Sequence, residues 1–168
     1  PPFNTGQLMV RGTAPGATGF YLGSSPLPNV FHFGGLSTVI NSDSLEEVVF
    51  LPGNYGVRYG RTLGGVVDLR TSPDLPTASH GYVSIDLMQS IAFISQPLGG
   101  RTGMTVSARR SYIDTVLQPA IKANTATSIQ LPRYWDAQAR LLHNTKRGGA
   151  VDLMLLTSGD RFSVTEAD

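Results

Sequence analysis

LEEVVFLPGNYGVRYGRTLGGVVDLRT, residues 45–71, is the stretch of this chain that decides its fold. Two apolar runs, Val48 to Leu51 and Val66 to Leu69, stand near its two ends. Apolar runs of this length bounded by turn residues are typical of short buried strands. The segment between them is rich in glycine, which can adopt positive φ without a Cβ clash. We therefore predict two strands joined by an excursion that turns at Gly53, Gly56, Gly60, Gly64 and Gly65.

The composition excludes several classes of protein. Only 15% of the 168 residues are charged, and the chain contains 19 glycines and 11 prolines, which favours many turns and short strands. A formal net charge of +1 gives no reason to expect a nucleic-acid partner. The absence of cysteine excludes disulfides, thiol catalysis and cysteine-based metal sites. No run approaches the roughly eighteen apolar residues of a membrane helix, so any membrane crossing would use strands.

The residues before position 29 predict two short strands. Residues 7–11 and 19–22 are each short strand-forming runs that end at a glycine. Pro26 and Pro28 keep the residues that follow out of a central strand, because proline cannot donate a ladder hydrogen bond.

Phe31, His32 and Phe33 follow these prolines and precede two glycines. One interpretation is that the phenylalanines belong to the core and that His32 is merely their neighbour. The other is a ligand-facing loop, because aromatic groups on a loop bounded by proline and glycine suit a binding surface. The sequence leaves both interpretations open.

Residues 40–47, INSDSLEE, contain a helix-start signal. Ser42 or Asp43 can cap the first amides of a helix, and Glu46 stands at capping-box spacing from Asp43. Glu46 and Glu47 do not form a catalytic acid–base pair, because adjacent side chains diverge on a helix or a strand.

The second half of the chain follows a linker-like segment, residues 72–80, and alternates between apolar and polar residues. We predict a strand over residues 82–88, with residues 91–96 as its continuation or as a bulged second half, and an end at Pro97. Residues 99–103, GGRTG, predict a hairpin turn. The remaining predictions are strands over residues 104–114, 134–144 and 150–156, a short helix over 113–123, a polar loop over 125–132 and a turn at 146–149.

Segments of about ten residues with one apolar and one polar face are typical of a transmembrane β-barrel. The same alternation fits a soluble antiparallel sheet with one buried face, so periodicity alone does not separate the two.

The plug domain of TonB-dependent outer-membrane receptors resembles the first half of this chain. The resemblance is carried by Arg11-Gly12, residues 20–24, Ile40-Asn41 and residues 45–71. Within residues 45–71, the family's acidic-hydrophobic strand corresponds to residues 47–51 and its final strand to residues 66–71. Between them, the family has a Pro-Gly, an aromatic-Gly and a Gly-Gly pair, which correspond to Pro52-Gly53, Tyr59-Gly60 and Gly64-Gly65.

The resemblance implies a fold and two domains. Residues 1–76 would form the C-terminal part of an α+β plug, and residues 77–168 the first antiparallel strands of an outer-membrane β-barrel that is not closed. Plugged transporters have about 22 strands, and the family's N-terminal half-plug and TonB-binding box are not recognisable here, so we expect the chain to be a piece of a longer protein. The turn at Gly23-Ser24 also departs from the family's usual Asp-Gly.

The implied function is that of a receptor in the bacterial outer membrane, which binds a scarce ligand and imports it through a plugged barrel. The partners would be the TonB system of the inner membrane, outer-membrane lipid and a small ligand of unknown class. No enzyme activity, cofactor or metal is implied. The alternatives are a structural or adhesive outer-membrane component with the same architecture, and a soluble ligand-binding α+β domain.

The resemblance also assigns roles to particular residues. Arg11 and Arg58 match two plug arginines that pair with glutamates of the barrel wall and lock the plug in place. Gly53, Gly60, Gly64 and Gly65 match the plug's turn glycines. On the barrel strands the apolar positions would face lipid, and the polar positions that would face the lumen are Ser84, Asp86, Thr105, Ser107, Arg109, Asp136, Gln138 and Arg140.

Overall fold

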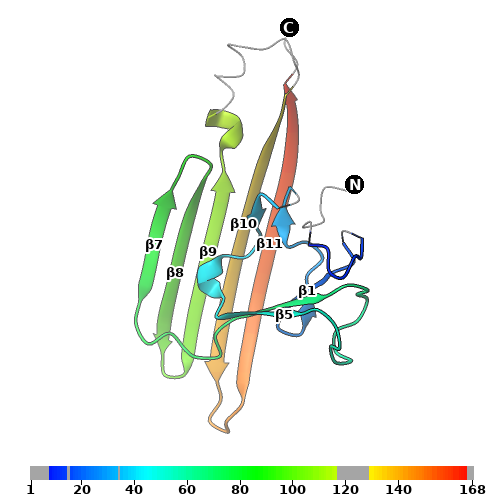
Figure 1. Ribbon diagram of the computed structural model, residues 1–168. Helices are drawn as coiled ribbons and strands as arrows, with labels where there is room; N and C mark the ends of the chain where they lie inside the picture. Colours follow the sequence, from blue (N-terminus) through cyan, green and yellow to red (C-terminus); the bar gives the residue numbers. More distant parts are fainter. Residues whose placement is uncertain (1–7, 15, 34, 117–128, 166–168) are drawn as a thin grey trace. The chain divides into compact units, whose positions relative to one another are not determined.

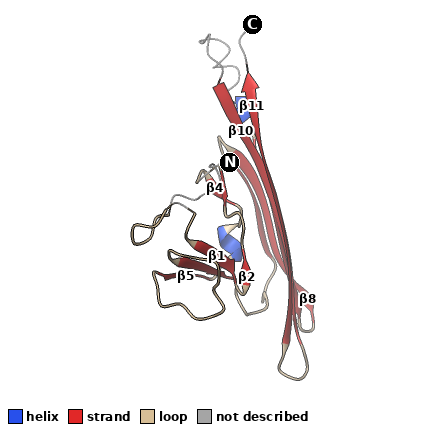
Figure 2. Ribbon diagram, turned by 90° about the vertical axis from the view of Figure 1, so that its right-hand side faces the viewer, coloured by secondary structure: helices blue, strands red, loops and turns tan. Residues whose placement is uncertain are grey.

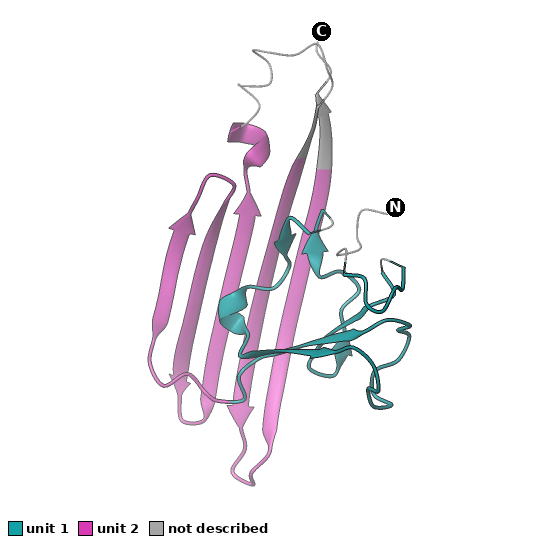
Figure 3. Ribbon diagram, viewed as in Figure 1, with its two compact units in different colours: residues 1–73 teal, residues 74–168 magenta. Residues whose placement is uncertain are grey.

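A computed structural model describes residues 8–14, 16–33, 35–116 and 129–165 (Figure 1). The chain divides into two compact units, Pro1–Pro73 and Asp74–Asp168 (Figure 3). Taken together, the described residues are mostly β-strand, although the strands of the first unit are short; most strands pair antiparallel, and the described strands do not close a barrel. In the residues that the structure describes, helix is confined to one 3-10 turn and to residues 113–116, so the described part of the first half shows a single 3-10 turn of the α+β character expected of it.

The first unit is organised around strand β6 (Val66–Arg70). It lies in a four-stranded sheet of order β2-β1-β6-β5, between β1 (Gly19–Leu22) and β5 (Glu47–Leu51), with β2 (Ser25–Pro26) at one edge. β6 pairs antiparallel with β5 and parallel with β1. The two apolar runs of the 45–71 stretch are therefore neighbouring strands, as predicted, but only β6 is buried, because Val48 and Phe50 of β5 are exposed.

Two smaller features complete the first unit. β3 (Phe31–His32) and β4 (Ser37–Thr38) form a short antiparallel hairpin, and η2 (Ser42–Ser44) is a single 3-10 turn. The predicted helix start was placed one residue late, because the capping side chain is Asn41, whose Oδ1 accepts from the amide of Asp43 at 2.9 Å. No capping box extends the turn, since the chain enters β5 at Glu47.

The strand predicted over residues 7–11 is not present in its described part. Residues 8–10 have no regular structure, and Arg11 and Gly12 form a turn with φ values of 53° and 75°. A left-handed backbone at two successive positions cannot continue a strand.

The second unit is a meander of five antiparallel strands in the order β11-β10-β9-β8-β7 (Figure 1). Seen edge-on in Figure 2, it is a single curved layer. β7 and β11 are its outer strands, and every strand pairs with its sequence neighbour. The bounds are β7 His80–Ile85, β8 Gln89–Gly99, β9 Thr102–Ser111, β10 Ile129–Asn144 and β11 Ala150–Thr165.

Several predicted boundaries in this unit were wrong. The strand predicted over residues 82–88 ends at Ile85, and residues 89–99 form a second strand that pairs back onto it. Pro97 lies inside β8, because β7 pairs with β8 only as far as Ser95 and no neighbour on that side needs the missing amide.

The hairpin predicted at residues 99–103 is confirmed, with Gly99 and Gly100 at φ values of 87° and 59°. β10 begins at Ile129, before the predicted start at residue 134, and β11 continues to Thr165, beyond the predicted end at residue 156. The predicted helix begins at Ile113, and its part beyond residue 116 lies outside the described residues. Residues 125–128 of the predicted polar loop also lie outside them, and its residues 129–132 form the start of β10 instead of a loop.

Candidate functional site

Three tyrosines of the first unit hold the excursion between β5 and β6. Tyr21 and Tyr59 pack edge to face with ring centroids 5.0 Å apart, and Tyr55 packs against Tyr59 at 6.5 Å. The Tyr21 hydroxyl donates to the carbonyl of Gly60 at 2.7 Å, and the Tyr55 hydroxyl donates to the carbonyl of Thr62 at 3.0 Å. Phenolic hydroxyls thus replace regular secondary structure as the partners of these loop carbonyls.

Thr62 ties the end of the excursion to β1. Its hydroxyl lies 2.9 Å from the carbonyl of Ala17 and 3.0 Å from that of Gly65, and it accepts from the amide of Gly19 at 3.1 Å. One threonine therefore serves backbone groups of two segments that are distant in sequence.

The glycines of the excursion do not play the role predicted for them. None of the five has a positive φ; Asn54 and Arg61, each next to one of them, have φ values of 57° instead. Asparagine tolerates the left-handed region better than most residues, whereas Arg61 adopts it despite its Cβ.

Close packing explains three of these glycines. A Cβ at Gly65 would lie 2.9 Å from the Phe50 ring, and one at Gly64 would lie 2.8 Å from the Thr13 hydroxyl. A Cβ at Gly53 would overlap the Arg11 guanidinium. Around Gly56 and Gly60, by contrast, a Cβ would meet nothing within 4 Å, and the structure gives no steric reason for a glycine at either position.

A cleft of about 910 Å³ opens on the first unit beside this framework. Its apolar wall includes a Phe20–Phe31 pair that packs edge to face with centroids 5.6 Å apart. Two exposed arginines, Arg58 and Arg61, also line it. An aromatic wall beside guanidinium groups can accept a ligand that combines an apolar body with a negative charge.

The three aromatic residues predicted as a ligand-facing loop do not act together in this cleft. Phe31 lines the cleft, whereas His32 is fully buried, with 0% exposure. Phe33 is half-buried and has a φ of 49°. The ligand-facing interpretation therefore has geometric support at Phe31. The core interpretation assigned the wrong residues, because His32 is buried and the two phenylalanines are half-buried.

The two arginines predicted as a plug lock are both exposed. Arg58 lies with its Cζ 5.1 Å from the centroid of the Tyr59 ring, a cation–π contact, and Arg11 lies against Gly53. Within the described part of the chain, neither has a carboxylate at ion-pair distance. The lock remains a prediction.

Sequence reasoning missed a buried carboxylate at the centre of the first unit. Asp68 on β6 is 2% exposed, and its Oδ2 accepts from the Tyr59 hydroxyl at 2.9 Å and from Arg70 Nε at 3.0 Å. Arg70 also donates to Glu47 at 2.8 Å. These contacts, above all the one with Asp68, raise the pKa of the Arg70 guanidinium. A charged residue inside the apolar run 66–69 was the available signal, because such a charge needs partners.

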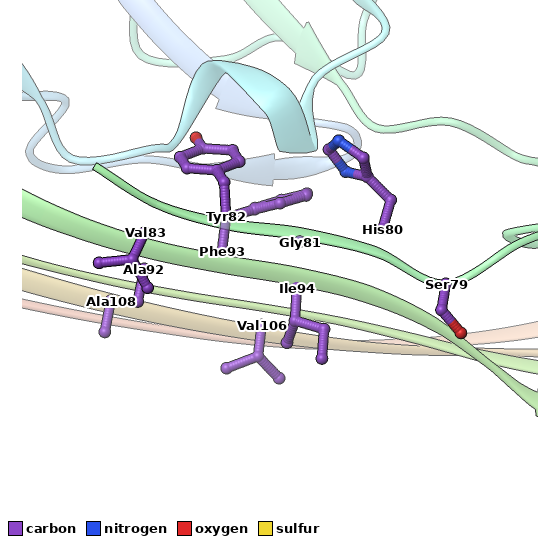
Figure 4. Close-up of a pocket in the computed structure, with 10 residues that line it drawn as sticks. All are labelled: Ser79, His80, Gly81, Tyr82, Val83, Ala92, Phe93, Ile94, Val106 and Ala108. Atoms are coloured by element: carbon purple, nitrogen blue, oxygen red, sulfur yellow. The ribbon is translucent and has the colours of Figure 1, made fainter.

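The sheet of the second unit has two faces of different character. Cross-strand register places seven of the eight polar residues predicted to face a lumen on one face, which we call the polar face. The predicted apolar set shares the other, which we call the apolar face. Figure 4 shows both: Tyr82 and His80 project to one side, whereas Val83, Ile94 and Val106 project to the other.

The exception is Asp86, which lies in the turn between β7 and β8. Its Oδ1 accepts from the amides of Met88 at 2.7 Å and Gln89 at 2.8 Å, and these bonds lower the pKa of the Asp86 carboxyl. The Tyr112 hydroxyl closes the same turn onto the carbonyls of Asp86 and Gln89. Asp86 therefore shapes a turn instead of lining a face.

Ion pairs cross the polar face between neighbouring strands. Arg109 Nε lies 2.7 Å from Asp136 Oδ2, and the two side chains are only 7% and 1% exposed. Arg140 donates two hydrogen bonds to the Asp152 carboxylate, at 2.9 and 2.7 Å. Two-point contacts of this kind fix orientation as well as charge.

The apolar face is exposed over most of its area. Val83 and Ile85 on β7 are 74% and 75% exposed, and Leu155 on β11 is 64% exposed. A shallow groove of about 530 Å³, lined on this face by Val83, Ala92, Ile94, Val106 and Ala108, crosses β7, β8 and β9 (Figure 4). Contiguous exposed apolar surface on this scale marks an interaction surface.

The described residues bring together no group of three or more His, Asp or Glu side chains that could hold a metal ion. No helix in the described part of the chain is long and apolar enough to cross a membrane. Comparisons with models of protein families, with curated proteins and with solved structures gave no match.

Proposed function

We propose that this chain is part of a TonB-dependent receptor of the bacterial outer membrane, which imports a scarce ligand. In this proposal the first unit is the C-terminal part of the plug, and the second unit contributes the first strands of the barrel. The energy for import comes from the inner-membrane TonB system and not from chemistry in this chain.

One observation carries the proposal: the second unit presents an exposed apolar face backed by a polar face that contains ion pairs. In a soluble sheet the apolar face is covered by other protein, whereas in an outer-membrane barrel it faces lipid and the polar face lines the interior. The glycine-paced stretch 45–71 adds independent support through its resemblance to a plug.

The strand lengths fit the same proposal. From Trp135 to Leu141, the apolar face along β10 covers six residue steps, or about 20 Å at the rise of an antiparallel strand. An outer-membrane barrel carries an apolar band about 25 Å tall, flanked by aromatic residues. The cleft of the first unit, with Phe31 and Arg58 in its wall, is our candidate for ligand contact.

Adjacent leucines on β11 offer a matched test of membrane insertion. Leu155 belongs to the apolar face, and Leu156, one residue later, belongs to the polar face. Leu155→Arg places a charge in lipid and should cost about 2–4 kcal/mol of folding free energy in a bilayer. Leu156→Arg, with the same change in volume and charge, should cost much less. The measurement is the folded fraction in lipid vesicles against urea; equal costs would contradict a lipid-facing apolar face.

Import is tested in the complete gene product. Deletion of the TonB-binding segment should abolish growth on the receptor's ligand, with a ferric siderophore, cobalamin, a sugar or a peptide supplied in turn as the limiting nutrient. If cells without the TonB-binding segment grow as well as the wild type on every nutrient, the result would favour a structural or adhesive role.

A further inference from the structure

Three arginines gather where the apolar face of the second unit ends. Register places Arg133 of β10 directly opposite Arg161 of β11. Arg110 of β9 stands opposite Trp135, one step along the same face. Here β10 and β11 continue past the end of β9 as a two-stranded ribbon (Figure 1).

The arginines of this cluster outnumber the aspartates near it, which are Asp114 and Asp160. Like charges directly opposite each other on paired strands are destabilising. Asp114 lies 4.0 Å from Arg133, but within the described residues Arg110 and Arg161 have no carboxylate at ion-pair distance. Asp160 pairs with Tyr134, which places it on the polar face by register, and it also lines the recess beside the arginines. The arrangement thus favours an external anion.

An indole forms the floor between the arginines. Trp135 lies across Gly159 of the neighbouring strand, where a Cβ would come within 2.6 Å of its Nε1. Because Gly159 has no side chain, the Trp135 ring can pack against its backbone, and Trp135 remains 47% exposed. The ring and the arginines, together with Tyr134 and Asp160, line a recess of about 400 Å³.

The recess has a charged side and an apolar side. The charged side is the arginine cluster. On the other side the apolar face continues from Trp135 through Ala137 and Ala139 toward Leu141. Tryptophan prefers the boundary between apolar and polar surroundings, and arginine binds phosphate through paired donors. A phosphate group attached to a hydrocarbon chain matches both sides, whereas a free phosphate uses only one.

We propose that Arg110, Arg133 and Arg161 bind the net-negative phosphate headgroup of a membrane phospholipid, whose acyl chains lie along the apolar face beside Trp135. This inference rests on the proposed outer-membrane location. It adds a lipid-binding site on the outside of the barrel, separate from the cleft of the first unit.

Trp135 is the only tryptophan of the chain, so its fluorescence reports on this site alone. The complete gene product, with any tryptophan other than Trp135 replaced by phenylalanine, is folded into phosphatidylcholine vesicles that contain a minor fraction of either brominated phosphatidylglycerol or brominated phosphatidylcholine with identical acyl chains. We expect phosphatidylglycerol to quench Trp135 at a several-fold lower mole fraction, with a preference that weakens as salt is raised. Inorganic phosphate at the same bulk concentration should not displace the lipid.

Two substitutions assign the effect to the cluster. Arg161→Gln should reduce the preference for phosphatidylglycerol by about fivefold, the contribution of one arginine near an anionic surface. Arg110→Gln is an independent second variant with the same expectation. Arg101→Gln makes the same change in the hairpin turn at the other end of the sheet and should leave the preference unchanged.

The outcomes separate this inference from the proposed function. Equal quenching by the two brominated lipids would overturn the headgroup site while leaving Trp135 in the membrane. Quenching by neither would place Trp135 outside the bilayer and would overturn the proposed function as well.

Discussion

The two units of this chain make β-structure in different ways. The longest strands of the first unit have five residues, and its shape depends on individual side chains that bind distant backbone groups. The second unit has strands of up to 16 residues, joined by continuous ladders in which side chains alternate between two faces.

This difference predicts where each unit is sensitive to substitution. In the first unit a single hydroxyl or a missing Cβ fixes a local path, and removal of that one contact has no substitute. In the second unit the ladder bonds are made by backbone, so a side chain matters mainly through the face on which it lies. The substitutions below test this contrast, from the largest expected effect to the smallest.

The largest effect is expected at Gly65. Gly65→Val would place its Cβ 2.9 Å from the Phe50 ring and 3.1 Å from the carbonyl oxygen of Leu51. The backbone neighbour cannot move aside, so we expect a loss of about 3 kcal/mol, at the upper end of overpacking costs. Amide hydrogen exchange should accelerate in β5 and β6 and stay unchanged in β10 and β11.

Gly60→Val is the matched control. Gly60 has no positive φ, and a Cβ added there would meet no atom within 4 Å, so its cost should stay near the roughly 0.5 kcal/mol of an ordinary surface change. Equal costs at the two positions would contradict close packing as the reason for Gly65.

A smaller effect is expected at Tyr59. Tyr59→Phe keeps the ring and removes the hydroxyl that donates to the buried Asp68 carboxylate. A buried charged acceptor that loses a donor costs about 1–3 kcal/mol. Chemical denaturation followed by exchange in β6 measures the loss.

Tyr55→Phe provides the comparison for Tyr59. Its hydroxyl serves the carbonyls of Thr62 and Gly64, which are neutral, and the side chain is half-buried. We expect about 0.5–1.5 kcal/mol here. A larger loss of stability for Tyr55→Phe than for Tyr59→Phe would contradict the buried Asp68 charge as the reason for the cost at Tyr59.

Sequence patterns predicted strands better than they predicted the reasons for particular residues. The runs at residues 48–51 and 66–69 are neighbouring strands, as their apolar content and flanking glycines predicted, but only β6 is buried, and Val48 and Phe50 of β5 are 59% and 49% exposed. The role of the glycines was wrong, since a glycine that avoids a clash and one that needs positive φ look identical in a sequence. That distinction depends on Phe50, Thr13 and Arg11, which are fixed only by the folded structure.

The turn between β7 and β8 was missed for a related reason. It contains neither glycine nor proline, and the apolar alternation continues through it. Its determinant is the Asp86 side chain, which binds two amides that follow it. Aspartate is a turn former by this mechanism, but one aspartate in an alternating segment is also an ordinary strand residue.

The candidate cleft was only partly predictable. Phe31 and Arg58 were each singled out from local sequence, but nothing local indicated that they share one wall. Their proximity follows from the parallel pairing of β1 with β6, a long-range contact without a short-range signal.

The outer strands of the second unit have a consequence for assembly. Among the described strands, β11 has a 16-residue outer edge and β7 a six-residue outer edge, so the two edges of the sheet differ in the length of strand they can pair with. Long, open edges beside apolar surface recruit any strand that arrives, including another copy of the same chain. In the proposed barrel both edges are paired with further strands, and the longer ladder of that pairing forms along β11.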